Sequence, residues 1–303
     1  MTASLDMPFD RLLDPDLPAP LMWFVLAWLF AVGACIGSFM NVVIYRLPAG
    51  LSLLHPPSRC PDCETPIRAT DNVPIFGWLW LRGRCRHCQA RISPRYPAVE
   101  LLVAVVFAGL AWAEPLSRLN LPSSAAELTM GQLWGLYAYH LLLLCSLICA
   151  AFIEFDRHAL PMRLAIPVLI VGLTAPVNWP NLRPSATVFV SSPALNALVD
   201  GGVGALAGAA LGYAIGWSSR LSLPERMPFR GATGDNNSAI ALAWVGAFLG
   251  WQAVVAVATA TLVSGVVVVL IGRIVPTFRS AGWTTSIAVW CPVWMLASKC
   301  VLR

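Results

Sequence analysis

Long apolar runs are the feature of this sequence that most limits how the chain can fold. A helix needs about 17–25 mainly apolar residues to cross a lipid bilayer. Runs of roughly that length lie at 21–44, 97–113, 131–153, 164–179, 195–217, 238–253, 254–272 and 283–298. Only 12% of the 303 residues are charged, about half the fraction that is usual in soluble domains. We therefore expect an all-α polytopic membrane protein with about eight transmembrane helices.

The positions of the arginines predict how these spans are oriented. The segment between the first two spans holds Arg46, Arg59, Arg68, Arg82, Arg84, Arg86, Arg91 and Arg95. By the positive-inside rule this segment is cytoplasmic. Eight spans then place 154–163, 218–237 and 273–282 inside as well, and leave the tail 1–20 and the connections 114–130 and 180–194 outside. Membrane topology thus accounts for the net charge of +5, and we expect no nucleic-acid partner.

Glycines recur at every fourth residue in one span, at Gly204, Gly208, Gly212 and Gly216. This spacing places them on one helix face, where the absence of side chains lets a neighbouring helix approach closely. We interpret the row as a helix-packing seam.

Four of the nine cysteines have the spacing of metal ligands. Cys60 and Cys63 form one CxxC turn, and Cys85 and Cys88 form a second. Two such turns can close a tetrahedral Zn²⁺ site that leaves no open position for catalysis. A cytoplasmic location is reducing and disfavours structural disulfides, so free or redox-active thiols are the alternative. The similar phrases CPDCETPIR and CRHCQARIS predict a small zinc-ribbon-like loop.

Several motifs occur together in a characteristic order. They are GSFMNVVIYRLP (37–48), the paired CxxC loop, RYPAVELL (95–102), FIEFDRHALP (152–161) and GATGD (231–235), followed by AWVGAFLGWQ (243–252). In wording and order the set resembles the bacterial type IV prepilin leader peptidases, also called prepilin peptidase/N-methyltransferases. These are GxGD-type aspartyl proteases of the inner membrane.

The resemblance implies two activities at the cytoplasmic face of the inner membrane. The peptidase would cleave the leader of type IV prepilins or type II secretion pseudopilins, which would be its partners beside membrane lipid. The methyltransferase would then methylate the new N-terminus with S-adenosylmethionine, an activity linked to the Cys-rich loop. The chain would comprise a non-cytoplasmic tail (1–20), a first transmembrane helix (21–44), a cytoplasmic Cys-rich domain (45–96) and a membrane-embedded peptidase domain (97–303).

Three carboxylates are the candidate catalytic residues. Glu154 and Asp156 follow the third predicted span, and Asp235 precedes the sixth, both at the cytoplasmic face. Peptide hydrolysis by paired carboxylates needs one as a base and one as an acid, about 3 Å apart. Asp235 could also be only the N-cap of the helix that follows it.

The sequence departs from the family's pattern at four places. Glu154 stands where the family usually has aspartate, Met162 follows Leu160-Pro161 in place of aspartate, and Asn237 replaces a lysine. The segment 284–292 reads TTSIAVWCP and lacks the expected Pro-Phe-Gly-Pro. The cleaving pair could therefore be Glu154 with Asp235, Asp156 with Asp235, or an inactive remnant.

Two alternatives to an active peptidase remain, the first motivated by these departures and the second by the polytopic body with acidic residues at membrane depth. The chain could be a catalytically degenerate relative that binds pilins without cleaving them. It could also be a transporter, although its carboxylates lie at one membrane face rather than at the midplane. No glycine-rich nucleotide motif marks the residues that would bind the methyl donor, and no pattern indicates an oligomeric state.

Overall fold

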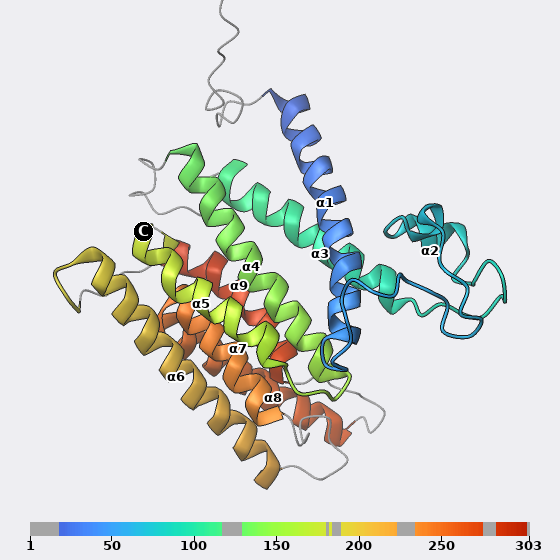
Figure 1. The fold of residues 1–303 in the computed structure, drawn as a ribbon. Coiled ribbons are helices and arrows are strands. Elements are labelled where there is room, and N and C mark those ends of the chain that lie inside the picture. Colours follow the sequence, from blue (N-terminus) through green and yellow to red (C-terminus); the bar gives the residue numbers. More distant parts are fainter. Residues whose placement is uncertain are drawn as a thin grey trace, which may run out of the picture. The chain divides into compact units, whose positions relative to one another are not determined.

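The computed structural model describes residues 18–116, 129–179, 182–183, 189–222, 234–274 and 283–301, with side chains for all of these except 219–222, 234–235, 266–274, 283 and 296–301. Its helices are α1 (Ala19–Arg46), α2 (Phe76–Trp80), α3 (Arg95–Ala111), α4 (Met130–Phe155), α5 (Met162–Asn178), α6 (Pro193–Ser222), α7 (Gly234–Leu249), α8 (Trp251–Ile274) and α9 (Trp283–Val301) (Figure 1). A 3-10 turn, η2 (Ala69–Asn72), and a π-helical turn, η3 (Trp112–Leu116), complete the helical segments. No β-strand occurs in these ranges, so the predicted all-α fold is confirmed. Of the predicted tail 1–20, residues 1–17 lie outside the described residues.

Each predicted span corresponds to a helix. Among the described residues, four helices are long and apolar enough to cross a membrane: Ala19–Arg46, Arg95–Leu116, Met130–Phe155 and Pro193–Ser218. Shorter apolar helices cover Met162–Asn178, Asn236–Leu249 and Trp251–Gly265. The chain is therefore an integral membrane protein by the length and composition of its helices.

The boundary between the sixth and seventh predicted spans lies at Gly250 rather than between residues 253 and 254. Gly250 has φ +84° and its N–H donates to the carbonyl of Gly246, which ends α7. Only glycine adopts this backbone conformation without strain. A Cβ atom there would also lie 2.9 Å from the carboxylate of Asp200.

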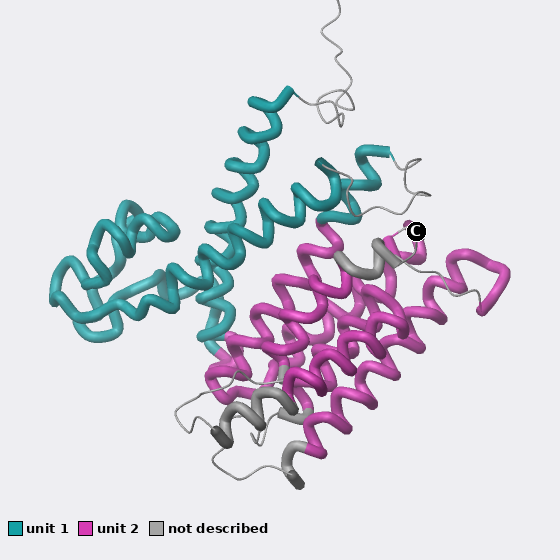
Figure 2. Tube along the Cα trace, turned by 180° about the vertical axis from the view of Figure 1, so that it is seen from behind, with its two compact units in different colours: residues 1–46, 51–137 teal, residues 47–50, 138–303 magenta. Residues whose placement is uncertain are grey.

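The chain divides into two compact units, residues 1–46 with 51–137 and residues 47–50 with 138–303 (Figure 2). In the first unit α1 packs directly on α3. A Cβ atom added to Gly33 would lie 2.8 Å from Cα of Ala104, and one added to Gly37 would lie 2.7 Å from Cα of Glu100. Glycine at these two positions is what allows the two backbones to approach so closely.

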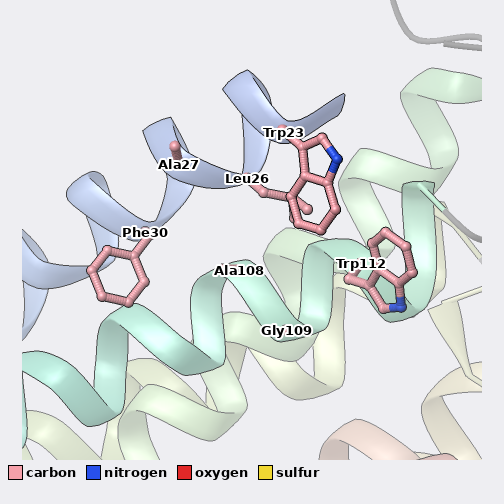
Figure 3. A pocket seen from close by; sticks show the side chains of 7 residues that line it. All are labelled: Trp23, Leu26, Ala27, Phe30, Ala108, Gly109 and Trp112. Atoms are coloured by element: carbon pink, nitrogen blue, oxygen red, sulfur yellow. The ribbon is translucent and has the colours of Figure 1, made fainter. Parts of the chain in front are cut away.

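An apolar groove of about 600 Å³ lies between α1 and α3 (Figure 3). Its lining residues are Trp23, Leu26, Ala27, Phe30, Ala108, Gly109 and Trp112. The rings of Trp23 and Trp112 are stacked at 6.2 Å. None of the lining side chains carries an ionisable group, so the groove has no residue for acid–base chemistry.

In the second unit the predicted glycine seam joins α6 to α7. Cβ atoms on Gly204, Gly208 and Gly212 would each come within 3.0 Å of the α7 backbone. The hydroxyl of Ser238 donates to the carbonyl of Gly212 at 2.8 Å, which adds a polar contact to the seam. The packing role predicted for these glycines is therefore confirmed.

A buried ion pair also holds the second unit together. Arg183 and Asp200 lie 3.5 Å apart, with side chains only 3% and 4% exposed. The guanidinium donates as well to the carbonyl of Ala197 on α6 and, at 2.9 Å, to that of Ala247 on α7. This arginine, predicted to lie in an outside connection, is thus part of the helix packing.

Candidate active site and metal centre

The four predicted metal ligands lie together in the segment between α1 and α3. Their sulfur atoms all lie within 4.8 Å of one another. The separations are 3.7 Å between Cys60 and Cys88 and 4.0 Å between Cys63 and Cys85. Tetrahedral zinc with Zn–S bonds of about 2.3 Å requires sulfur atoms about 3.8 Å apart. The arrangement therefore fits a four-thiolate metal ion.

The two CxxC turns have the same backbone conformation, offset by 25 residues. The N–H groups of Cys60 and Cys85 donate to the carbonyls five residues later, at 3.0 and 2.8 Å. The residue after each second cysteine, Glu64 or Gln89, has positive φ, +55° and +59°. This left-handed residue turns the chain back after each cysteine pair, so both pairs of thiols point toward a common centre.

Hydrogen bonds in these turns favour the thiolate form, which is the form that binds metals. The hydroxyl of Thr65, 3.3 Å from the sulfur of Cys63, together with the Thr65 backbone lowers the pKa of that thiol to about 6. The backbone N–H groups of Cys88 and His87 lower the pKa of Cys85. Donors are therefore already directed at the sulfur atoms of Cys63 and Cys85, whereas at Cys88 the hydrogen bond from the Ala90 backbone is outweighed by burial and the neighbouring thiols, which raise the pKa of that thiol to about 12.

Polar contacts hold the Cys-rich segment together and connect it to α3. Arg86, between the ligands of the second turn, forms a two-pronged ion pair with Asp71, with N–O distances of 2.8 and 2.5 Å. The N–H of Ile75 donates to the carboxylate of Glu100 on α3 at 2.6 Å. Ile75 has φ +64°, a strained value for a β-branched residue, and this hydrogen bond helps to hold it. The RYPAVELL motif thus supplies an anchor for the loop through Glu100, a role that the sequence did not reveal.

The first two candidate catalytic residues lie at the end of α4. The helix ends in a Schellman motif, in which His158 N–H donates to Ile153 C=O and Arg157 N–H donates to Glu154 C=O. Arg157 takes the left-handed position, with φ +61°. Glu154 is therefore in the last turn of α4, whereas Asp156 is the first residue after the helix.

Asn237 connects this segment to the start of α7. Its side-chain oxygen accepts the N–H of Leu160 at 2.7 Å, and its side-chain nitrogen donates to the carbonyl of His158 at 2.9 Å. Asn237 is fully buried. The first turn of α7, which contains Asp235, thus lies against the residues that follow Glu154. The side chain of Asp235 itself lies outside the described residues.

Glu154 has a specific partner on a third helix. Its carboxylate accepts the backbone N–H of Thr284 at 2.7 Å, at the start of α9. Thr284 is fully buried. The sequence did not identify Asn237 or Thr284 as contacts of the end of α4. In the sequence each residue is only a departure from a family motif.

Comparisons with known proteins show which family the chain belongs to. Residues 31–114 match the Bacterial Peptidase A24 N-terminal domain. The chain is 37% identical over 259 residues to the prepilin leader peptidase/N-methyltransferase of Aeromonas hydrophila, covering 77% of this chain and 76% of that protein. For the proteins of the same name from Pectobacterium carotovorum subsp. carotovorum and Neisseria gonorrhoeae the identities are 34% and 31%, with 84% and 88% of this chain and 85% and 92% of the relatives covered. No solved structure shows significant similarity to the chain.

At these identities, over more than two thirds of each relative's length, the chain belongs to the prepilin leader peptidase/N-methyltransferase family.

Proposed function

We propose that this protein cleaves the leader peptides of type IV prepilins or type II secretion pseudopilins and methylates the N-terminus that cleavage exposes. The observation that carries the peptidase activity is the pair of hydrogen bonds made by Asn237, which hold the first turn of α7 against the segment after α4. That contact supports the convergence of Asp235 with the carboxylates of the FIEFD motif.

Glu154 and Asp235 are the proposed catalytic pair, with Asp156 as the alternative partner of Asp235. One carboxylate takes a proton from water, whose oxygen attacks the carbonyl carbon of the scissile peptide bond. The other carboxyl gives its proton to the leaving nitrogen as the C–N bond breaks. Because α4 ends at Phe155, Glu154 lies in its last turn and Asp156 just after it, and Glu154 is the one that is hydrogen-bonded to α9.

The Cys-rich segment is proposed to bind one structural Zn²⁺ through Cys60, Cys63, Cys85 and Cys88. Four protein ligands leave no open coordination position, so the ion would stabilise the loop rather than activate water. S-adenosylmethionine, when bound, supplies the methyl group that is transferred to the amine. The peptidase carboxylates belong to the second compact unit, and the four cysteines, in the loop to which the resemblance links methylation, belong to the first.

The protein is proposed to lie in the bacterial inner membrane with its Cys-rich loop and peptidase site facing the cytoplasm. The arginines between the first two spans support this orientation. The partners are then prepilins or pseudopilins and membrane lipid, without nucleic acid. We further propose that residues 45–96 form the Cys-rich domain and residues 97–303 the peptidase domain.

Co-expression with a prepilin tests both activities at once. Mass spectrometry of the pilin N-terminus distinguishes uncleaved, cleaved and methylated products in one sample. We expect cleaved, methylated pilin with the wild-type protein, and uncleaved prepilin with Asp235→Asn. Pilin that binds the wild-type protein but keeps its leader would instead identify a degenerate pilin-binding relative.

A further inference from the structure

Two departures from the family's pattern meet in a single contact. Glu154 replaces the usual aspartate in α4, and the Thr-Thr segment at the start of α9 stands where Pro-Phe-Gly-Pro is expected. They are 130 residues apart in the chain, yet the carboxylate of Glu154 accepts the N–H of Thr284 at 2.7 Å. A glutamate is longer than an aspartate by one methylene, about 1.5 Å.

The geometry of α9 explains why this N–H is available. Thr284 is the second residue of the helix, and the first four N–H groups of a helix have no acceptor within it. Thr284 is fully buried, so water does not supply the missing acceptor. The carboxylate of Glu154 does so, and the contact also fixes a side chain that has one more rotatable bond than aspartate.

From this contact we infer that Thr284 is a positioning residue of the peptidase site, whose backbone N–H fixes the direction of the Glu154 carboxylate. This inference rests on the proposed role of Glu154 in cleavage. It adds that the first turn of α9 is part of the peptidase site.

Proline substitution isolates the N–H from the side chain. Thr284→Pro removes the donor, and proline is tolerated in the first turn of a helix. Thr285→Pro is the matched control, because it places proline one residue later while leaving the donor to Glu154 intact.

The measurement is the rate of leader cleavage by purified protein, with kcat and KM determined separately. Misplacing a catalytic group by about 1 Å lowers the rate by roughly a hundredfold. We therefore expect Thr284→Pro to lower kcat by about ten- to a hundredfold with little change in KM. Thr285→Pro should stay within about twofold of wild type.

A second background distinguishes positioning from general damage to α9. In Glu154→Asp the shorter side chain does not reach Thr284, so adding Thr284→Pro should cause no further loss. An equal loss in both backgrounds would overturn the inference, as would equal rates for the two proline variants. If Glu154→Asp has no measurable turnover, the comparison of the two proline variants decides. Full activity of Glu154→Gln would instead refute the proposed role of Glu154 itself.

Discussion

Replacing Asn237 with alanine tests whether α7 is fixed to the segment that follows α4. The side chain makes two hydrogen bonds there, accepting from Leu160 N–H at 2.7 Å and donating to His158 C=O at 2.9 Å. Leu160 is 4% exposed and Asn237 is fully buried. The alanine variant removes both bonds without adding a group that could replace them.

The free-energy cost of the substitution depends on whether water can reach each backbone group that loses its hydrogen-bond partner. The Leu160 N–H is left buried without its acceptor, which costs about 1–3 kcal/mol. His158 is exposed, so water can reach its carbonyl and only the net value of a hydrogen bond is lost, about 0.5–1.5 kcal/mol. Together these give about 2–4 kcal/mol for opening the contact. Since about 1.4 kcal/mol is a factor of ten, exchange of the Leu160 amide should accelerate roughly thirty- to several-hundredfold.

Hydrogen–deuterium exchange of the purified protein, followed in a peptide that contains Leu160, measures this change. Asn236→Ala is the matched control, because Asn236 is exposed in the same helical turn. The control should exchange as the wild type does. Unchanged exchange in Asn237→Ala, or an equal acceleration in the control, would show that the Asn237 side chain does not hold α7 against the segment after α4. Leader cleavage should slow in Asn237→Ala alone, since only that change frees α7 from the segment after Glu154.

Three further predictions concern the metal centre and the buried charges. Purified protein should contain about one zinc ion per chain by elemental analysis and lose it in Cys60→Ser; a metal-free wild type with an intact fold would contradict this. The pKa of Asp71 is lowered by its hydrogen bond to Arg86 and by that residue's charge, so the pair contributes stability above about pH 4, the usual value of an aspartate, and loses it as the pH falls below that range. Asp71→Asn should therefore speed amide exchange of residues 69–77 at pH 7 and at pH 5; a difference that vanished between these two pH values would be inconsistent with this sign. Arg183→Met should lower the free energy of unfolding by about 3–5 kcal/mol in denaturant titrations, because the buried carboxylate of Asp200 loses its cation; a change below about 1 kcal/mol would show that the pair is not important for stability.

The helices and the metal centre could be predicted because their signals are local. A run of apolar residues identifies a membrane helix without reference to the rest of the chain. The CxxC spacing likewise brings Cys60 and Cys63 together within one turn, and the second turn, with Cys85 and Cys88, completes the set of four thiols. The glycine seam was predicted for the same reason, since a four-residue repeat fixes one face of α6.

The contacts that define the candidate active site could not be predicted, because they join distant segments. Asn237 was interpreted as the loss of a lysine, whereas its amide binds backbone groups 77 and 79 residues away. Thr284 was interpreted as the loss of a proline-containing motif, and its N–H is bound by a residue 130 positions earlier. Arg183 was placed in an outside connection by the predicted spans and the positive-inside rule, and neither signal shows that its side chain is only 3% exposed.

The most direct test of the proposed active site is the rate at which purified variants remove the leader from one prepilin. Glu154→Gln, Asp156→Asn and Asp235→Asn are compared with wild type under single-turnover conditions, with the N-terminus identified by mass spectrometry. We expect Glu154→Gln and Asp235→Asn to lose cleavage and Asp156→Asn to retain it. Cleavage by Asp235→Asn at the wild-type rate would show that Asp235 is not a catalytic residue.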